Sequence, residues 1–169
     1  MYPFWSPDGA DIGFFADGQL KRVAIAGGPV QPICDAPRTF PSGSWNERNQ
    51  ILFSLGTASG FQLVAASGGS VTTVPANRFS DRPQWVSGTD RFIFIDREPA
   101  NPKMMIGSVS GGTPSVLLDL DAASSGALLA PSNVRVFNRA GALYAQRFDP
   151  SRLAVTGAAR ALLDAPPLA

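Results

Sequence analysis

The sequence alternates short apolar runs with polar turns, and the runs have the length and spacing of β-strands. Residues 12–15, 51–53 and 92–95 are apolar almost throughout, and each is followed by a polar turn and a second apolar run. Runs that are apolar on both sides are typical of strands buried between two sheets. No window shows the periodicity of an amphipathic helix. The pattern therefore predicts an all-β protein.

These runs recur with a period near forty residues, which is the mark of a repeat architecture. The three tryptophans stand forty residues apart, and a glycine pair closes the third run of each unit at spacings of 41 and 43. The tryptophans are Trp5, Trp45 and Trp85, and the glycine pairs are Gly27-Gly28, Gly68-Gly69 and Gly111-Gly112. At equivalent positions in successive units, the tryptophans are expected to pack between sheets as core.

Tight turns divide each of the first three units into four strands. Residues 6–9 have proline and glycine where a tight turn needs them. Asp17-Gly18 is a strong hairpin signal, since both central residues of such a turn need positive φ. After the segments that carry the tryptophans, the expected strands lie near residues 12–15, 20–25, 30–34, 51–53, 61–64, 71–74, 92–95, 104–106 and 116–118. The hairpin at residues 96–102 is enlarged.

A fourth unit has lost its tryptophan but keeps the same order of features. Residues 130–133 stand where residues 6–9 stood, which puts Leu129 in the tryptophan position. Strands are expected at residues 134–137, 143–148 and 161–164, with a longer loop over residues 149–157 in place of the glycine pair.

Four antiparallel strands joined by tight turns make one blade of a β-propeller. We therefore predict a single propeller segment, residues 1–169, of four consecutive four-stranded antiparallel blades. They cover about residues 1–37, 38–77, 78–121 and 122–165. Four blades left as an open arc would expose apolar faces at both ends. A fragment of a longer protein is the favoured explanation, a homodimer of two half-rings is second, and closure of four blades alone is third.

The composition argues against several classes of function but does not identify a function. There are 14 basic and 13 acidic residues, no histidine and one cysteine. The near-zero net charge, with no basic cluster, argues against a nucleic-acid partner. No apolar run is long enough to span a bilayer, so we expect no direct membrane insertion. The first residues lack the features of a signal peptide.

The motif Trp5-Ser6-Pro7-Asp8-Gly9, with the later glycine pair, resembles the TolB-like, WD-like propeller repeats of bacteria. In the second and third units the tryptophan and the glycines remain, but the Pro-Asp-Gly turn is lost. The resemblance implies a bacterial propeller and, in this repeat family, one face of the disc that carries two sets of loops. These are the fourth-to-first-strand connections and the second-to-third-strand hairpins.

A narrower resemblance, from about Arg78 to the end of the chain, is to the C-terminal propeller of bacterial transmembrane serine/threonine kinases, and its motifs lie in the last unit. The matching segments are residues 141–143 (Gly-Ala-Leu), 145–149 (Ala-Gln-Arg-Phe-Asp) and 152–157 (Arg-Leu-Ala-Val-Thr-Gly). It implies attachment to a membrane kinase, with the disc on the periplasmic side of the inner membrane. Kinase catalytic motifs are absent from these residues, so no kinase chemistry follows.

The loop face implied by the family is our candidate site for a protein or peptide partner. Two of its linkers carry an arginine followed closely by a phenylalanine, a composition that suits protein contacts. The candidate residues are Arg38, Phe40, Arg78, Phe79, Arg82, Arg97 and Glu98. The plainer reading is that the phenylalanines fill gaps between blades and the arginines pair with neighbouring acids.

No catalytic, cofactor-binding or metal-binding residues are predicted. Cys34 has no basic neighbour and is expected to be an inert, buried or half-buried thiol. Asp119 and Asp121 lack the further ligands that a calcium loop needs. Asp96 and Glu98 resemble the acid pair of a glycosidase only weakly, and a polar loop tip is preferred.

Three hypotheses about function remain, and catalysis within these residues is a weaker fourth. The first is a non-enzymatic interaction or ligand-sensing module of a larger bacterial signalling protein. The second is the substrate-gating propeller of a prolyl-oligopeptidase-type peptidase, whose catalytic domain would follow residue 169. The third is a periplasmic TolB-like partner protein. A kinase or peptidase domain elsewhere in a parent protein would make that parent an enzyme.

Overall fold

The structure, a computed structural model, describes residues 3–37, 41–56, 60–76, 80–98, 102–120, 124–130 and 133–163. Within these ranges every regular element is a β-strand. The described part of the chain has no helix of the length and hydropathy needed to cross a membrane. The all-β prediction is therefore confirmed.

In the described residues, sixteen strands form four antiparallel sheets of four, and the strands of each sheet follow one another in sequence order. Sheet A contains β1 (Phe4–Trp5), β2 (Asp11–Ala16), β3 (Gln19–Ala24) and β4 (Gln31–Asp35). Sheet B contains β5 (Ser42–Trp45), β6 (Gln50–Ser54), β7 (Phe61–Ala65) and β8 (Thr72–Val74). Sheet C contains β9 (Ser80–Trp85), β10 (Arg91–Asp96), β11 (Lys103–Ser108) and β12 (Ser115–Asp119). Sheet D contains β13 (Ser124–Ala130), β14 (Val134–Arg139), β15 (Ala142–Asp149) and β16 (Ala154–Leu163).

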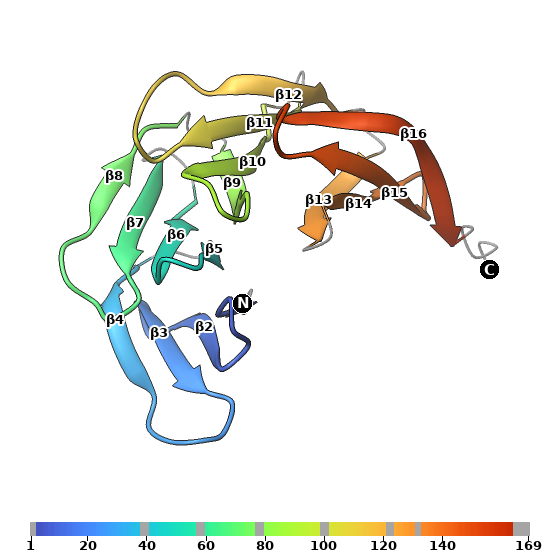
Figure 1. Cartoon of the computed structure of the whole chain (residues 1–169). Coiled ribbons are helices and arrows are strands. Elements are labelled where there is room, and N and C mark those ends of the chain that lie inside the picture. Colours follow the sequence, from blue (N-terminus) through green and yellow to red (C-terminus); the bar gives the residue numbers. More distant parts are fainter. Residues whose placement is uncertain are drawn as a thin grey trace.

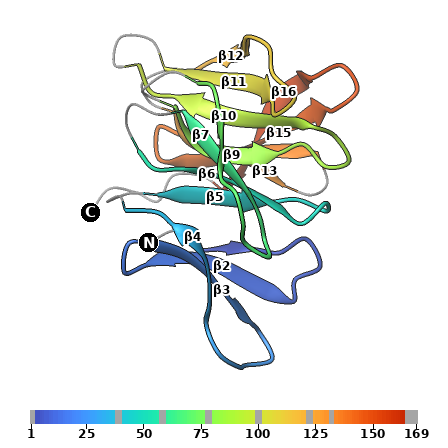
Figure 2. The ribbon, with the colours of Figure 1, turned by 90° about the vertical axis from the view of Figure 1, so that its left-hand side faces the viewer.

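The four sheets fan out as an open arc of propeller blades (Figure 1). The first strand of each sheet lies toward the inside of the arc and the fourth strand lies on its outer rim. Turned by 90°, the sheets stack one upon the next from sheet A at one end (Figure 2). The arc leaves one face of sheet A and one face of sheet D without a neighbouring sheet.

The predicted turns form as the sequence requires. Asp17 and Gly18 have φ of 53° and 72°, so the hairpin between β2 and β3 has positive φ at both central residues. The turn after the first strand ends in a positive-φ residue in three of the sheets: Gly9 (φ 70°), Asn49 (φ 55°) and Asn133 (φ 56°). Glycine and asparagine tolerate this conformation best, which explains how the turn survives the loss of the Pro-Asp-Gly motif.

Apolar side chains fill the spaces between adjacent sheets. Sheets A and B share a cluster that includes Phe15 and Leu20 from sheet A with Ile51 and Phe53 from sheet B. Sheets B and C meet where the ring of Phe61 lies edge-on to two phenylalanines of β10, with centroids 5.4 and 5.2 Å away. Sheet D contributes its own phenylalanine from β15 to the cluster of sheet C. The core is thus a series of sheet-to-sheet interfaces, as a propeller requires.

The tryptophans do not all lie in the core, which corrects one expectation. Trp45 is 7% exposed and sits in the interface between sheets A and B. Trp85 is half-buried against sheet B, where its indole Nε1 donates to the backbone oxygen of Ser44 over 3.0 Å. Trp5 is 60% exposed, because no sheet lies on its side of sheet A.

The loop expected at residues 149–157 is shorter than predicted. β16 begins at Ala154, so the last four residues of that loop belong to the outer strand. The register of β16 against β15 shifts between Ala145 and Arg147, and Gly157 has a φ of 70° there. In a sequence, a glycine at a β-bulge gives the same signal as a glycine in a loop, although the strand continues through the bulge.

Sheets B and C are also joined by a hydrogen bond that depends on pH. The hydroxyl of Ser87, after β9, donates to the carboxylate of Glu47, after β5. This bond, with backbone donors and Arg48 adding to it, holds the pKa of Glu47 below its ordinary value of 4.5. A lowered carboxylate pKa stabilises the folded chain above the unfolded-state value, and this contribution is lost as the pH falls through 4.5 and below.

We therefore expect Glu47→Gln to reduce the acid dependence of stability. The loss of melting temperature from about pH 5 to pH 3 should be smaller in Glu47→Gln than in the parent chain, because one acid-sensitive bond is gone. Ser87→Ala should have the same effect, since it removes the donor. The melting temperatures are recorded by circular dichroism. An equal fall of the melting temperature in all three proteins over this pH range would contradict this assignment.

Candidate interaction site

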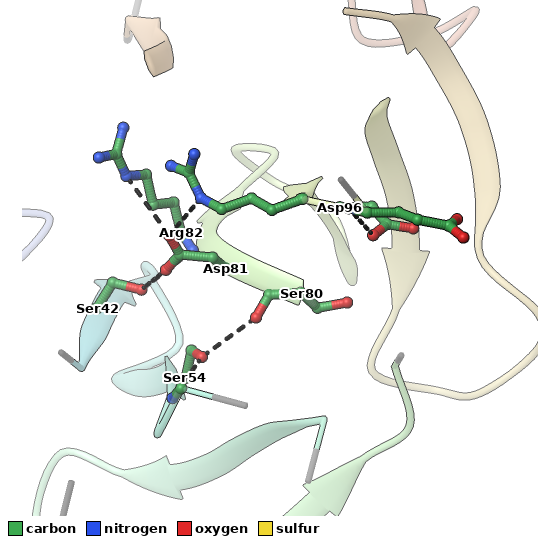
Figure 3. Close-up of polar contacts among 9 residues, drawn as sticks. Ser42, Ser54, Ser80, Asp81, Arg82 and Asp96 are labelled. Carbon is green, nitrogen blue, oxygen red and sulfur yellow. Dashed lines mark hydrogen bonds and ion pairs between the residues drawn. The ribbon is translucent and has the colours of Figure 1, made fainter. Parts of the chain in front are cut away.

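Polar side chains from sheets B and C converge at one end of the two sheets (Figure 3). β5 and β9 begin there, β6 and β10 end there, and the hairpin from β10 to β11 starts there. The centre of the group is Asp81, with Ser42, Arg82 and Arg97 bonded around it. We call these four residues the Asp81 cluster.

The Asp81 carboxylate accepts bonds from three parts of the fold. The hydroxyl of Ser42 donates to Oδ1 over 2.9 Å, which links sheet B to sheet C. Arg97, in the hairpin after β10, donates from Nε to Oδ2 over 3.1 Å. The Nε of Arg82 lies 3.7 Å from the same oxygen. One carboxylate thereby bonds to Arg97 and to the neighbouring sheet and lies within ion-pair distance of Arg82.

A bulge in β9 places Arg82 at this end of the sheets. The register of β9 against β10 shifts between the partners of Ile93 and Ile95, and Arg82 has a φ of 52°. Its backbone N–H donates to Asp81 Oδ1 over 2.7 Å and to Ser42 Oγ over 3.1 Å. A non-glycine residue in this backbone region is strained unless its surroundings hold it, and such residues are frequent at functional sites.

Buried polar residues beneath the cluster keep the ends of the strands in place. Ser54 donates from its hydroxyl to the backbone oxygen of Ser80 over 3.3 Å, again joining sheet B to sheet C. Asp96 is 6% exposed and accepts the backbone N–H of Glu98 over 3.1 Å, which starts the hairpin in a defined direction. Figure 3 shows these bonds beside the Asp81 cluster.

The two guanidinium groups of the cluster are partly open to solvent. The side chains of Arg97 and Arg82 are 45% and 38% exposed, and that of Asp81 is 28% exposed. Arg97 uses Nε for Asp81, which leaves its two Nη groups available as planar donors of the kind that bind carboxylates. A fixed guanidinium loses less side-chain entropy on binding than a mobile one.

The structure brings together part of the predicted loop face. Arg82 and Arg97 meet through Asp81, and Glu98 lies next to Arg97 in the same hairpin. Four further candidates fall outside the described residues: Arg38, Phe40, Arg78 and Phe79. Ser42 and Asp81 are not among the candidate residues named from the sequence, although Asp81 stands directly before Arg82 in a linker, residues 77–82, that the sequence assigns to the loop face. Only the spatial contact between two sheets reveals their role.

The structure also describes two other residues that the sequence raised as candidates, Cys34 and Asp119. Cys34 is half-buried, and burial, followed by the charge of Asp35, raises the pKa of its thiol. A raised pKa makes the thiolate scarce at neutral pH. Asp119 ends β12, whereas Asp121 lies outside the described residues. In the ranges that the structure describes, no three His, Cys, Asp or Glu side chains gather closely enough to hold a metal ion.

Comparison with solved structures identifies the class of fold as a β-propeller. A chain in the crystal structure of a nidogen/laminin complex superposes with a TM-score of 0.76 and 11% identity, over 98% of this chain and 65% of that one. TolB from Acinetobacter baumannii has a TM-score of 0.69 and 15% identity, over 94% of this chain and 44% of that one. Oligogalacturonate lyase in complex with manganese has a TM-score of 0.66 and 15% identity, over 95% and 52%.

The propeller fold, with TolB-type proteins among its structural neighbours, is thus confirmed. At identities of 11–15% the likeness shows the fold alone. This chain spans less than two thirds of the length of each of these proteins. No protein-family model and no curated protein sequence matches it.

Proposed function

We propose that the chain is a non-enzymatic protein- or peptide-interaction module that belongs to a larger bacterial signalling protein. The observation that carries the proposal is the Asp81 cluster. It presents two partly exposed arginines beside Asp81 at one end of sheets B and C, which Ser42 and Asp81 join. The ligand chemistry that fits is a peptide segment with a carboxylate side chain or a free carboxyl terminus.

The wider setting of the module is a further part of this proposal. The motifs of the last sheet favour attachment to a membrane kinase, with the propeller on the periplasmic side. A periplasmic TolB-like partner protein is the second candidate, favoured by the structural likeness to TolB. A gating propeller of a prolyl-oligopeptidase-type peptidase is the third, and a hydrolase domain following this segment in its parent protein would select it.

Peptide selection tests the proposed function directly. A phage-displayed library of random peptides is selected on the immobilised 169-residue chain, and the enriched peptides are synthesised for affinity measurement. We expect enrichment of peptides with Asp or Glu, and a Kd raised about tenfold by Arg97→Ala, because that substitution removes a charge-assisted bond.

A matched control separates this site from general charge effects. Arg22 lies on β3, far from the cluster, where it donates to Gln31. Arg22→Ala removes the same charge and should leave the Kd unchanged. If no peptide is enriched, or if Arg22→Ala and Arg97→Ala weaken binding equally, the Asp81 cluster is not the binding site. A hydrolytic activity of the chain that is lost in Asp96→Asn or Glu98→Gln would overturn the non-enzymatic assignment.

A further inference from the structure

The free sheet faces at the two ends of the arc are of different kinds, and within the arc these two kinds of face pack against each other. Within the arc, each sheet buries one face against the preceding sheet and the other against the following sheet. In the part of the chain that the structure describes, no sheet precedes sheet A and none follows sheet D (Figure 1). The free face at one end is therefore of the kind that packs, within the arc, against the kind of face left free at the other end.

The free face of sheet A, here called the A face, consists of Trp5, Ile12, Phe14 and Val23. Alternation along the strands puts these residues on one side, opposite the ring of Phe4, which points toward sheet B. Trp5 is 60% exposed and the other three are half-exposed. Among the described strands, no sheet covers this apolar face.

The strand register assigns an equivalent in sheet B to each residue of the A face. Trp5 pairs with Ile12, and Ile12 with Val23, just as Trp45 pairs with Ile51 and Ile51 with Val64. The sheet B equivalents are buried against sheet A, with exposed fractions between 0% and 7%: Trp45, Ile51, Phe53 and Val64. The A face therefore has the composition of a buried interface between blades.

The free face of sheet D, here called the D face, corresponds to the side of sheet B that receives Trp85. In sheet B that side is the row Ser44, Leu52 and Leu63. The same register places Val136 and Ala145 in one row of sheet D. Next to Ala145 lies an open hollow of about 360 Å³.

We propose that the A face of one copy of this chain binds the D face of a second copy. Trp5 of the first copy then lies over the row of Ala145 of the second, as Trp85 lies over the row of Leu63 within the chain. Charge agrees with this pairing. The last two strands of sheet D carry the exposed arginines Arg147 and Arg160. The A face carries the exposed Asp35 at its outer strand, and its one lysine, Lys21, is paired with Asp17.

A contact of this kind is heterologous, which gives it a specific signature in mixtures. Trp5→Arg disables the A face only, and Ala145→Arg disables the D face only. Neither substitution lies in the core between sheets, so both variants should keep the circular-dichroism spectrum and melting transition of the parent chain. Each variant alone lacks one half of the contact and should elute at the 17.8 kDa mass of one chain.

Mixing the two variants should restore a single contact, because each supplies the face that the other lacks. We expect light scattering on a sizing column to give a complex of two chains for the mixture and one chain for each variant. Val71→Arg is the control. It changes an exposed valine away from both end faces and should associate like the parent chain.

Three results would overturn the proposal. The first is a mixture that stays at the mass of one chain. The second is self-association of Ala145→Arg alone, which would mean that A faces pair with A faces. The third is a parent chain that stays at the mass of one chain at every concentration tested. The peptide-binding proposal stands or falls separately, since the Asp81 cluster lies on neither end face.

Discussion

Trp45→Ala is expected to lower the free energy of unfolding by about 3–5 kcal/mol, the usual cost of truncating a large buried aromatic side chain. Trp45 is 7% exposed and packs in the interface between sheets A and B, and its indole Nε1 donates to Asn49 over 3.3 Å. Because a domain of this size is stable by only about 5–15 kcal/mol, this loss is a large share of the total stability. Urea unfolding followed by circular dichroism measures the change.

Trp5→Ala is the matched control for this prediction. The same substitution at the equivalent position of sheet A removes a side chain that is 60% exposed. At low protein concentration, where chains are separate, it should change the free energy of unfolding by about 0.5 kcal/mol or less. Equal losses in the two variants would show that the two tryptophans share one environment, and the arrangement of sheets described above would be wrong.

Gly43→Ala is expected to have the second largest effect, because a side chain from sheet A occupies the space beside Gly43. A Cβ atom added to Gly43 would lie 2.5 Å from Cε1 of the Phe4 ring. The ring also lies over Gly13 of its own sheet, so it is held on both sides. Overpacking of this kind typically costs about 1–3 kcal/mol. Thermal and urea unfolding of Gly43→Ala should show this loss.

A double-mutant cycle identifies the cause of that loss. Phe4→Leu shortens the side chain that meets the new methyl group, so the Phe4→Leu/Gly43→Ala variant should be more stable than the sum of the single effects predicts. If the two effects simply add, the ring of Phe4 does not lie against Gly43, and the first strand of the chain is placed wrongly.

Most of the fold could be predicted because local signals repeat. Asp17-Gly18 specifies a hairpin on its own, and the apolar runs specify strands buried on both sides. The degenerate fourth unit was found through its turn, where Asn133 has the positive φ that glycine has in the first unit. The bulge at Gly157 escaped prediction, since a glycine in a sequence gives the same signal in a loop and in a bulged strand.

The candidate site was predictable only in part, and for a physical reason. Arg82 and Arg97 stood out because arginine-rich linkers are visible in the sequence, but their common partner Asp81 is defined by contacts between strands. Ser42 comes from a different sheet, thirty-nine residues from Asp81, and joins the cluster only when two blades stack. Exposure of Trp5 likewise depends on which sheets have neighbours, which the repeat pattern does not encode.

The most direct test of the open arc is the solution mass of the parent chain as a function of concentration, measured by light scattering on a sizing column. The account predicts a mass that rises above the 17.8 kDa of one chain as concentration increases, because every molecule carries an unused A face and an unused D face. A mass that stays at 17.8 kDa up to the highest soluble concentration, together with cooperative unfolding, would contradict it. That result would mean that the end faces are covered within a single chain.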